Sequence, residues 1–226
     1  PDKIVGKGSE KSFTPIKKVA IDNNIKVFQP KKIRKEYSDI LALEPDIIVT
    51  CAYGQIIPKA ILDAPRLGCI NVHGSLLPKL RGGAPIHHAI MDGLEETGIT
   101  IMYMDVSMDS WDIISQRSIP ITDNDNVGIL WDKLSLLGRD LLIDTLPSII
   151  DGTNDRIKQD ESLVTYGFNI SKEDELIDFN NNSRDIFNKI RGLNPFPVGY
   201  SFLDNKRIKN VNTAKIPSDK KPLHIN

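Results

Sequence analysis

Residues 70–78 read Ile-Asn-Val-His-Gly-Ser-Leu-Leu-Pro, which is the pattern of a strand that ends at a ligand site. Residues two apart on a strand share a face, so Asn71 and His73 point to one side while Ile70 and Val72 are buried on the other. Glycine and proline then stop the strand. Most Asn and His residues at strand ends are structural hydrogen-bonding groups. In a wound α/β sheet, however, such an edge is where ligands bind, so the pair is a candidate site.

Strands and helices alternate on both sides of this stretch. The continuous apolar run 47–51 is typical of a strand that is covered on both faces, and residues 84–91 have a helical pattern. This alternation predicts an α/β fold with a Rossmann-like, mainly parallel sheet. The other expected helices begin at Thr14-Pro15 or cover residues 36–43 and 58–62, and the other expected strands cover residues 25–28, 99–106 and 113–119.

A long helix is predicted over residues 127–150, where leucines and isoleucines repeat at helical spacing. Gly152 and the polar stretch up to Ser162 read as a linker. We therefore expect a catalytic domain over residues 1–165 and a second domain over residues 166–226.

The composition is that of a globular protein. The chain has 226 residues, of which 40% are hydrophobic and 26% are charged. No apolar run reaches the roughly 18 residues that a membrane span needs, and no leader is evident. We expect a cytoplasmic monomer without membrane attachment, in which Cys51 and Cys69 are buried core residues of a reducing compartment.

The charge is divided unevenly along the chain. Residues 1–36 contain ten Lys and Arg against four Asp and Glu, and residues 184–226 contain nine against three. The middle of the chain is acidic, so the net charge of −1 conceals two basic ends. Basic clusters are most often solvated surface, but two basic ends also suit a nucleic-acid backbone held by its phosphates.

Several segments together carry a resemblance to a known family. INVHGSLLPKLRGGAPI (70–86) and TGITIMYMDVSMD (97–109) resemble the folate-dependent formyltransferases, whose motif has Asn, His and a later Asp in this order. Within that family, the chain looks most like the methionyl-tRNA formyltransferase subfamily. The resemblance also includes PDKIVGKG (1–8), VFQP (27–30), AYGQIIPKAIL (52–62), LVTY (163–166), SKEDELIDF (171–179) and LNPFPVGY (193–200). The narrower resemblance rests on LVTY, SKED and NPFP, because these segments resemble the domain junction of the tRNA enzyme.

The resemblance implies the reaction and the catalytic residues. The reaction is formyl transfer from 10-formyltetrahydrofolate to the amino group of methionyl initiator tRNA, without a metal. Asn71 and His73 would stabilise the oxyanion, and Asp109 would raise the pKa of His73 and orient it.

The resemblance also implies the binding residues. Folate would lie between one wall made of Ser75, Leu76, Leu77 and Pro78 and another made of Tyr53, Gly54, Ile56 and Ile57, although plain core packing explains these apolar residues as well. Basic residues that would contact tRNA are Lys3, Lys7, Lys11 and Arg81.

The chain departs from the family pattern in two respects. The resemblance lacks the family's first strands and the complete C-terminal β-barrel domain, so the sequence looks like an internal fragment. Trp111 stands where the family has glycine. An indole at that position is expected to strain the Asp109 loop or to block the mouth of the site, and on that hypothesis Trp111→Gly raises formylation.

Three other functions remain open. A metal hydrolase would use His73, His87, His88 and Asp109, but adjacent histidines point apart and the sequence has no HExxH motif. A formyltransferase or formylfolate hydrolase that acts on a small molecule would use the same three residues as the tRNA enzyme. A non-catalytic tRNA-binding remnant is suggested by Trp111 and by the missing ends of the resemblance.

Overall fold

A computed structural model describes residues 3–4, 11–105 and 109–213. Its contacts divide the chain into two compact units, Pro1–Ile48 with Tyr53–Cys69, and Val49–Ala52 with Ile70–Asn226. Among the described residues, none of the helices has both the length and the apolar composition that crossing a bilayer requires.

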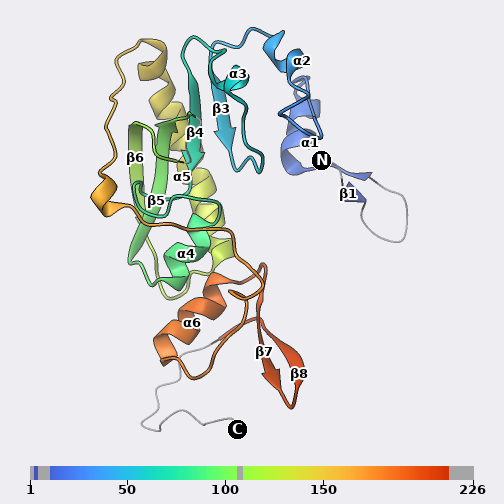
Figure 1. The fold of residues 1–226 in the computed structure, drawn as a ribbon, viewed down its shortest axis with the longest axis vertical. Coiled ribbons are helices and arrows are strands. Elements are labelled where there is room, and N and C mark those ends of the chain that lie inside the picture. Colours follow the sequence, from blue (N-terminus) through green and yellow to red (C-terminus); the bar gives the residue numbers. More distant parts are fainter. Residues whose placement is uncertain (1–2, 5–10, 106–108, 214–226) are drawn as a thin grey trace. The chain divides into compact units, whose positions relative to one another are not determined.

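The first unit contains short helices and one small sheet (Figure 1). Thr14 starts its first helix as expected, because its side chain accepts a hydrogen bond from the Lys17 amide (3.4 Å) and Pro15 follows it. Residues 25–28, which were predicted to form a strand, have no regular structure here. The elements are β1 (Lys3–Ile4), which pairs antiparallel with β2 (Lys11–Ser12), α1 (Pro15–Asp22), α2 (Ser38–Leu41) and α3 (Lys59–Leu62).

The second unit holds most of a four-stranded sheet. The strand order is β3 (Ile48–Cys51), β4 (Cys69–His73), β5 (Glu96–Tyr103) and β6 (Ile113–Pro120). The β4–β5 and β5–β6 pairs are antiparallel, so they depart from the parallel arrangement that the alternation of strands and helices suggested. Seven of the eight residues of β5 are buried, because the strand lies inside the sheet and is covered on both faces.

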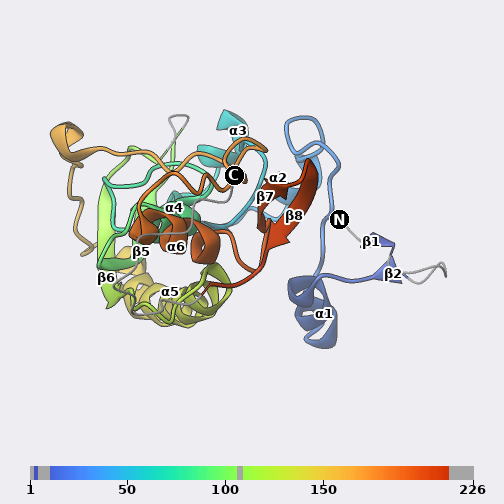
Figure 2. The ribbon, with the colours of Figure 1, turned by 90° about the horizontal axis from the view of Figure 1, so that it is seen from below.

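The long helix α5 (Val127–Ile150) has the predicted bounds, and the Asn126 side chain caps it by accepting from the Ile129 amide (2.9 Å). It packs along one face of β5 and β6 (Figures 1 and 2). At Gly138 the helix comes so close to the sheet that an added Cβ would lie 3.2 Å from Val72. The core between helix and sheet therefore takes up Val72 and leaves the other face of β4 for Asn71 and His73.

The remaining helices of this unit pack against each other. Helix α4 (Pro85–Met91) follows β4, and α6 (Ser183–Gly192) lies against it (Figure 2). Strands β7 (Gly199–Leu203) and β8 (Lys206–Asn210) form a two-stranded antiparallel sheet. Ile177, Ile190 and Leu193 form a small core beside them. The domain boundary near Thr165 stays a prediction.

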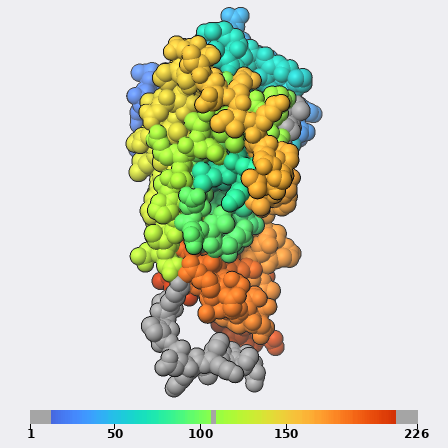
Figure 3. Space-filling model, turned by 90° about the vertical axis from the view of Figure 1, so that its left-hand side faces the viewer, coloured from blue at the N-terminus to red at the C-terminus, as the bar shows by residue number. Residues whose placement is uncertain are grey.

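Residues 151–169, here called the connecting segment, run along the surface of the second unit (Figure 3). One 3-10 turn, η1 (Glu161–Leu163), interrupts the segment. Isolated bridges pair Ile157 with Ile113 and Tyr166 with Arg81. The connecting segment is therefore attached to the second unit at these two points.

The two cysteines differ in their surroundings. Cys69 is buried as predicted, and burial together with Asp63 raises the pKa of its thiol to about 11. Cys51 is exposed, so the prediction that it belongs to the core was wrong. Both cysteines are free thiols.

Candidate active site

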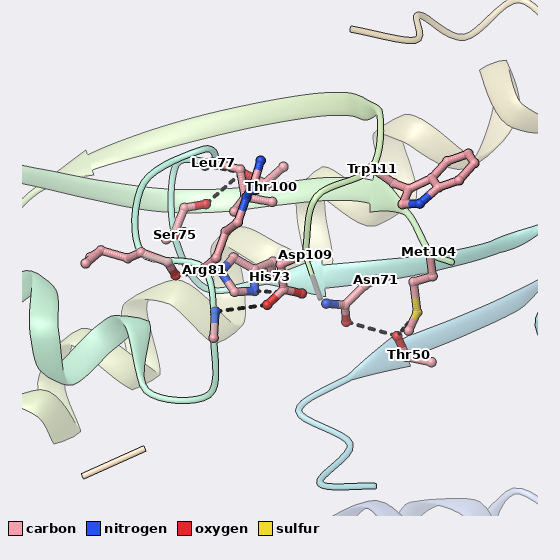
Figure 4. A network of polar contacts seen from close by, with 12 residues as sticks. Thr50, Asn71, His73, Ser75, Leu77, Arg81, Thr100, Met104, Asp109 and Trp111 are labelled. Carbon is pink, nitrogen blue, oxygen red and sulfur yellow. Dashed lines mark hydrogen bonds and ion pairs between the residues drawn. The ribbon is translucent and has the colours of Figure 1, made fainter. Parts of the chain in front are cut away.

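The two residues singled out on β4 lie at one site. Asn71 pairs with Met102 of β5, and His73 pairs with Thr100. Figure 4 shows both side chains on the same side of the strand, with Asp109 beside His73. The structure therefore brings the three predicted catalytic residues together.

The Asn71 amide makes a hydrogen bond with a threonine on the neighbouring strand. The Thr50 hydroxyl donates to Asn71 Oδ1 over 2.9 Å, and it also lies 3.2 Å from the Ile70 carbonyl and 2.9 Å from Met104 Sδ. Because the oxygen of the amide faces Thr50, its NH2 group points toward His73 and Asp109 (Figure 4). Thr50 is buried, so this contact is sheltered from water.

His73 is held in one tautomer. Its Nε2 lies 3.1 Å from the Leu80 carbonyl, which only accepts, so Nε2 carries the proton and donates. In neutral imidazole the lone pair is then on Nδ1, which lies 3.8 Å from Asp109 Oδ1, too far for a direct hydrogen bond. The side chain is only 5% exposed. Nδ1 is therefore the free basic atom of the site.

Burial decides the protonation state of this histidine. It lowers the pKa of His73, and this effect exceeds the opposing effects of Asp109 and the Leu80 carbonyl. Asp109 does raise the pKa of His73, as expected, but burial lowers it by more. The expectation of a raised pKa was therefore wrong. At neutral pH His73 is uncharged, so it starts as a proton acceptor.

Asp109 is anchored at both its side chain and its backbone. Its Oδ2 accepts from the Gly82 amide (3.0 Å), and its carbonyl accepts from Gln159 Nε2 (2.8 Å). Its φ is +50°, a left-handed conformation that few residues other than glycine adopt. These contacts hold the strained residue in place beside His73.

Trp111 does not carry the strain that the sequence suggested. Among the described non-glycine residues with positive φ, Asp109 is present and Trp111 is not. The indole is 38% exposed, and Figure 4 shows it pointing away from Asp109 and His73. The Trp111 carbonyl accepts from Gln159 Nε2 (2.8 Å). Glycine is therefore not required by the backbone at this position.

The first predicted folate wall is a well-anchored loop. Ser75 is 1% exposed, and its hydroxyl donates to the Lys79 carbonyl (2.6 Å). The Thr100 hydroxyl joins the loop to β5, because it donates to the Ser75 carbonyl (2.7 Å) and accepts from the Leu77 amide (3.1 Å). Leu77 is buried, whereas Leu76 and Pro78 are half-buried. Leu76 and Pro78 are thus the members of this wall with surface available to a ligand.

The second predicted wall belongs to the first unit. Tyr53, Gly54 and Ile56 are exposed and Ile57 is half-buried. Their surface is open to a ligand. The slot between the two walls stays a prediction.

The basic residues predicted to contact tRNA fall into two groups. Lys3 and Lys11 lie on β1 and β2, and Lys7 lies outside the described residues. Arg81 is only 4% exposed, and its guanidinium donates to Gln159 and Glu161. Its contacts favour a role within the protein over a contact with RNA.

The histidines of the metal-hydrolase alternative do not converge. Nε2 of His87 lies 3.1 Å from the Phe196 carbonyl, and Nε2 of His88 lies 3.1 Å from the Phe168 carbonyl. In the described part of the chain, no three His, Cys, Asp or Glu side chains are grouped so that they could hold a metal ion.

Sequence reasoning missed two residues that support the site, Thr50 and Gln159. Thr50 is a polar residue within the apolar run 47–51, and an unexplained polar group in a buried strand is a signal that could have found it. Gln159 lies in a polar linker, where nothing in its neighbourhood distinguishes it.

Comparison with known proteins supports the resemblance to the formyltransferases. The formyl transferase family model matches residues 1–146, and the model of the formyl transferase C-terminal domain matches residues 169–223. A methionyl-tRNA formyltransferase of Lysinibacillus sphaericus is 54% identical over 211 residues, which cover 92% of this chain and 67% of the relative.

Solved structures confirm the Rossmann-like formyltransferase fold. A 4-N formyltransferase from Francisella tularensis superimposes with a TM-score of 0.74 at 23% identity, covering 89% of this chain and 83% of that one. An N-formyltransferase from Helicobacter canadensis, in complex with folinic acid and dTDP-3-aminofucose, gives 0.67 at 24% identity, covering 84% and 68%. Taken with the sequence matches, these findings show that the chain belongs to the methionyl-tRNA formyltransferases, enzymes of the formyl transferase family.

Proposed function

We propose that this enzyme transfers the formyl group of 10-formyltetrahydrofolate to the amino group of methionine esterified to initiator tRNA. The observation that carries the proposal is the convergence of the Asn71 amide, the neutral His73 imidazole and the Asp109 carboxylate at the end of β4. Membership of the methionyl-tRNA formyltransferases supports the choice of substrates.

Asn71 is the donor for the oxyanion. When the amine attacks the formyl carbon, the carbonyl oxygen becomes negative, and a donor aimed at it lowers the barrier. The NH2 group of Asn71 meets this need because Thr50 already occupies the oxygen end of the amide. An amide also keeps its donor hydrogens at every pH. Removing such a donor typically costs about 2.7–4 kcal/mol of barrier.

His73 transfers the proton from the attacking amine to the folate nitrogen. The attacking amine must lose a proton as the new C–N bond forms, and the folate nitrogen must gain one as the old C–N bond breaks. Neutral His73 accepts the proton at Nδ1, directly or through a water, and returns it to the folate nitrogen. Once protonated, Nδ1 becomes a second donor beside the oxyanion, and Asp109 stabilises the imidazolium.

The proposed binding residues are those that the resemblance to the formyltransferases implies. Folate is held by the 75–78 loop and by Tyr53, Gly54, Ile56 and Ile57, with no metal. Lys3, Lys7 and Lys11 contact the acceptor stem through its phosphates, which gives affinity that falls with salt. The protein works as a cytoplasmic monomer.

The test is transfer of labelled formyl from 10-formyltetrahydrofolate to methionyl initiator tRNA. We expect wild-type turnover, a loss in kcat of about 10²–10³-fold for Asn71→Ala, and unchanged turnover for Asn181→Ala, a control at an exposed asparagine. Full activity of Asn71→Ala would contradict the donor assignment.

The same assay separates the alternatives. Label released as formate without an acceptor indicates a formylfolate hydrolase, and transfer to a small amine but not to the tRNA indicates a small-molecule enzyme. Binding of tRNA without any transfer indicates a binding remnant. Each of these results contradicts the proposed reaction.

A further inference from the structure

We propose that Gln159 is a positioning residue for the reaction: it links buried Arg81 to the backbone of Asp109 and thereby fixes the distance from Asp109 to His73. The proposal rests on the function proposed above. It assigns a catalytic consequence to the connecting segment, which the sequence presents as a plain linker.

All the hydrogen-bonding groups of the Gln159 amide are occupied. Its Oε1 accepts from Arg81 Nε (3.0 Å) and Nη2 (2.8 Å), and its Nε2 donates to the carbonyls of Asp109 and Trp111 (2.8 Å each). A guanidinium only donates and carbonyls only accept, so the amide fits in one orientation alone. The side chain is therefore a rigid link of defined polarity between Arg81 and the 109–111 turn.

Arg81 is a firm anchor for this link. Its side chain is buried, and its guanidinium also forms two hydrogen bonds with Glu161. Its backbone is tied to the connecting segment through Arg81 N to the Thr165 carbonyl (2.9 Å) and Gly167 N to the Arg81 carbonyl (2.8 Å). Arg81 is thus fixed through both its side chain and its backbone, and it can hold Gln159 in a defined position.

The turn that Gln159 holds needs such support. Asp109 has φ +50°, which an L residue adopts only when its surroundings impose it. Its carboxylate is fixed on the other side by the Gly82 amide, the residue next to Arg81. The Asp109 side chain is therefore positioned from Arg81–Gly82 at one end and from Gln159 at the other.

The sharpest variant is Gln159→Glu. A carboxylate still accepts from Arg81, so the connecting segment stays anchored, but it cannot donate to the carbonyls of Asp109 and Trp111 and repels them. The matched control is Glu161→Gln, because Glu161 also accepts from Arg81, lies on the same segment and is 70% exposed. The control keeps an acceptor for Arg81 and has no bond to the turn.

Two measurements report on the turn. Amide hydrogen exchange at Gly82 follows the Asp109 carboxylate without any turnover, because that amide donates to Asp109 Oδ2. We expect at least tenfold faster exchange at Gly82 in Gln159→Glu and less than a twofold change in Glu161→Gln. In the transfer assay we expect Gln159→Glu to lower kcat at least threefold, and to cause no further loss in an Asp109→Asn background.

The outcomes separate the two proposals. Absence of transfer in the wild-type protein refutes the proposed function, while Gly82 exchange still tests the link itself. Unchanged Gly82 exchange in Gln159→Glu, equal effects of both variants, or a full additional loss of kcat in the Asp109→Asn background would each overturn the role of Gln159.

Discussion

Replacing Thr50 by valine removes one hydroxyl and keeps the shape of the side chain. In the structure this hydroxyl donates to Asn71 Oδ1 and so keeps the amide NH2 directed at the reacting centre. Without it, the two orientations of the amide become closer in energy, and the wrong one presents an oxygen to the oxyanion. Thr50→Val therefore tests whether the orientation of Asn71 matters, apart from its presence.

The size of the effect follows from one neutral hydrogen bond. Such a bond contributes about 0.5–1.5 kcal/mol net, and 1.36 kcal/mol corresponds to a tenfold change in rate. We expect the rate constant of formyl transfer to fall about two- to tenfold in Thr50→Val, far less than the 10²–10³-fold loss expected for Asn71→Ala. The free energy of unfolding should change by no more than about 1.5 kcal/mol, since the side-chain volume is nearly conserved.

The assay is a single-turnover transfer of labelled formyl at saturating folate and tRNA, with Thr50→Ser as the matched control. Serine retains the hydroxyl, so its rate should stay within about twofold of the wild-type rate, because the donor to Asn71 remains. An unchanged rate in Thr50→Val, or an equal loss in both variants, would refute the argument that Thr50 orients the amide.

Two further predictions concern pH and packing. His73 should titrate below its ordinary pKa of 6.5, and Asp109→Asn should lower that pKa further because it removes the neighbouring negative charge; NMR titration of the imidazole measures both, and a pKa above 6.5 would contradict the role of burial. Because the unfolded chain binds the proton first, the contribution of His73 to stability is complete above pH 6.5 and declines as pH falls from there to the lowered pKa. Gly98→Ala should destabilise the fold by about 1–3 kcal/mol, since an added Cβ would lie 2.2 Å from the Arg117 carbonyl of β6. Gly54→Ala meets nothing within 4 Å and should leave the denaturation midpoint unchanged.

What the sequence predicted well depends on local patterns. The bounds of α5 follow from apolar spacing within one helix, and the cap at Asn126 is adjacent to it. Asn71 and His73 were recognised because residues two apart on one strand share a face. Asp109 was found through the resemblance to a family motif and not through any local pattern.

What the sequence did not reveal depends on contacts between distant residues. Gln159 lies 78 residues from Arg81 and 50 from Asp109, and Thr50 lies 21 residues from Asn71. The antiparallel pairing of β4 with β5 likewise depends on how the chain returns after α4, which apolar spacing does not record. The strand expected at residues 25–28 is not formed. A local pattern favours a strand, but a strand forms only where another strand pairs with it.

Asn71 is held on a strand and Asp109 on a loop, and each position suits what the residue does in the reaction. A hydrogen-bond donor must be placed closely, because a displacement of about 1 Å breaks the bond, and Asn71 stands on a central strand with its amide fixed by Thr50. Asp109 acts on His73 through charge across 3.8 Å, and Coulomb attraction falls only by about a fifth over one further ångström. A loop residue that is held by a side chain from the connecting segment is adequate for that task. Loss of the Gln159 link should therefore reduce the rate by less than loss of Asn71, and the reverse order would show that Asp109 makes a closer contact during the reaction than it makes here.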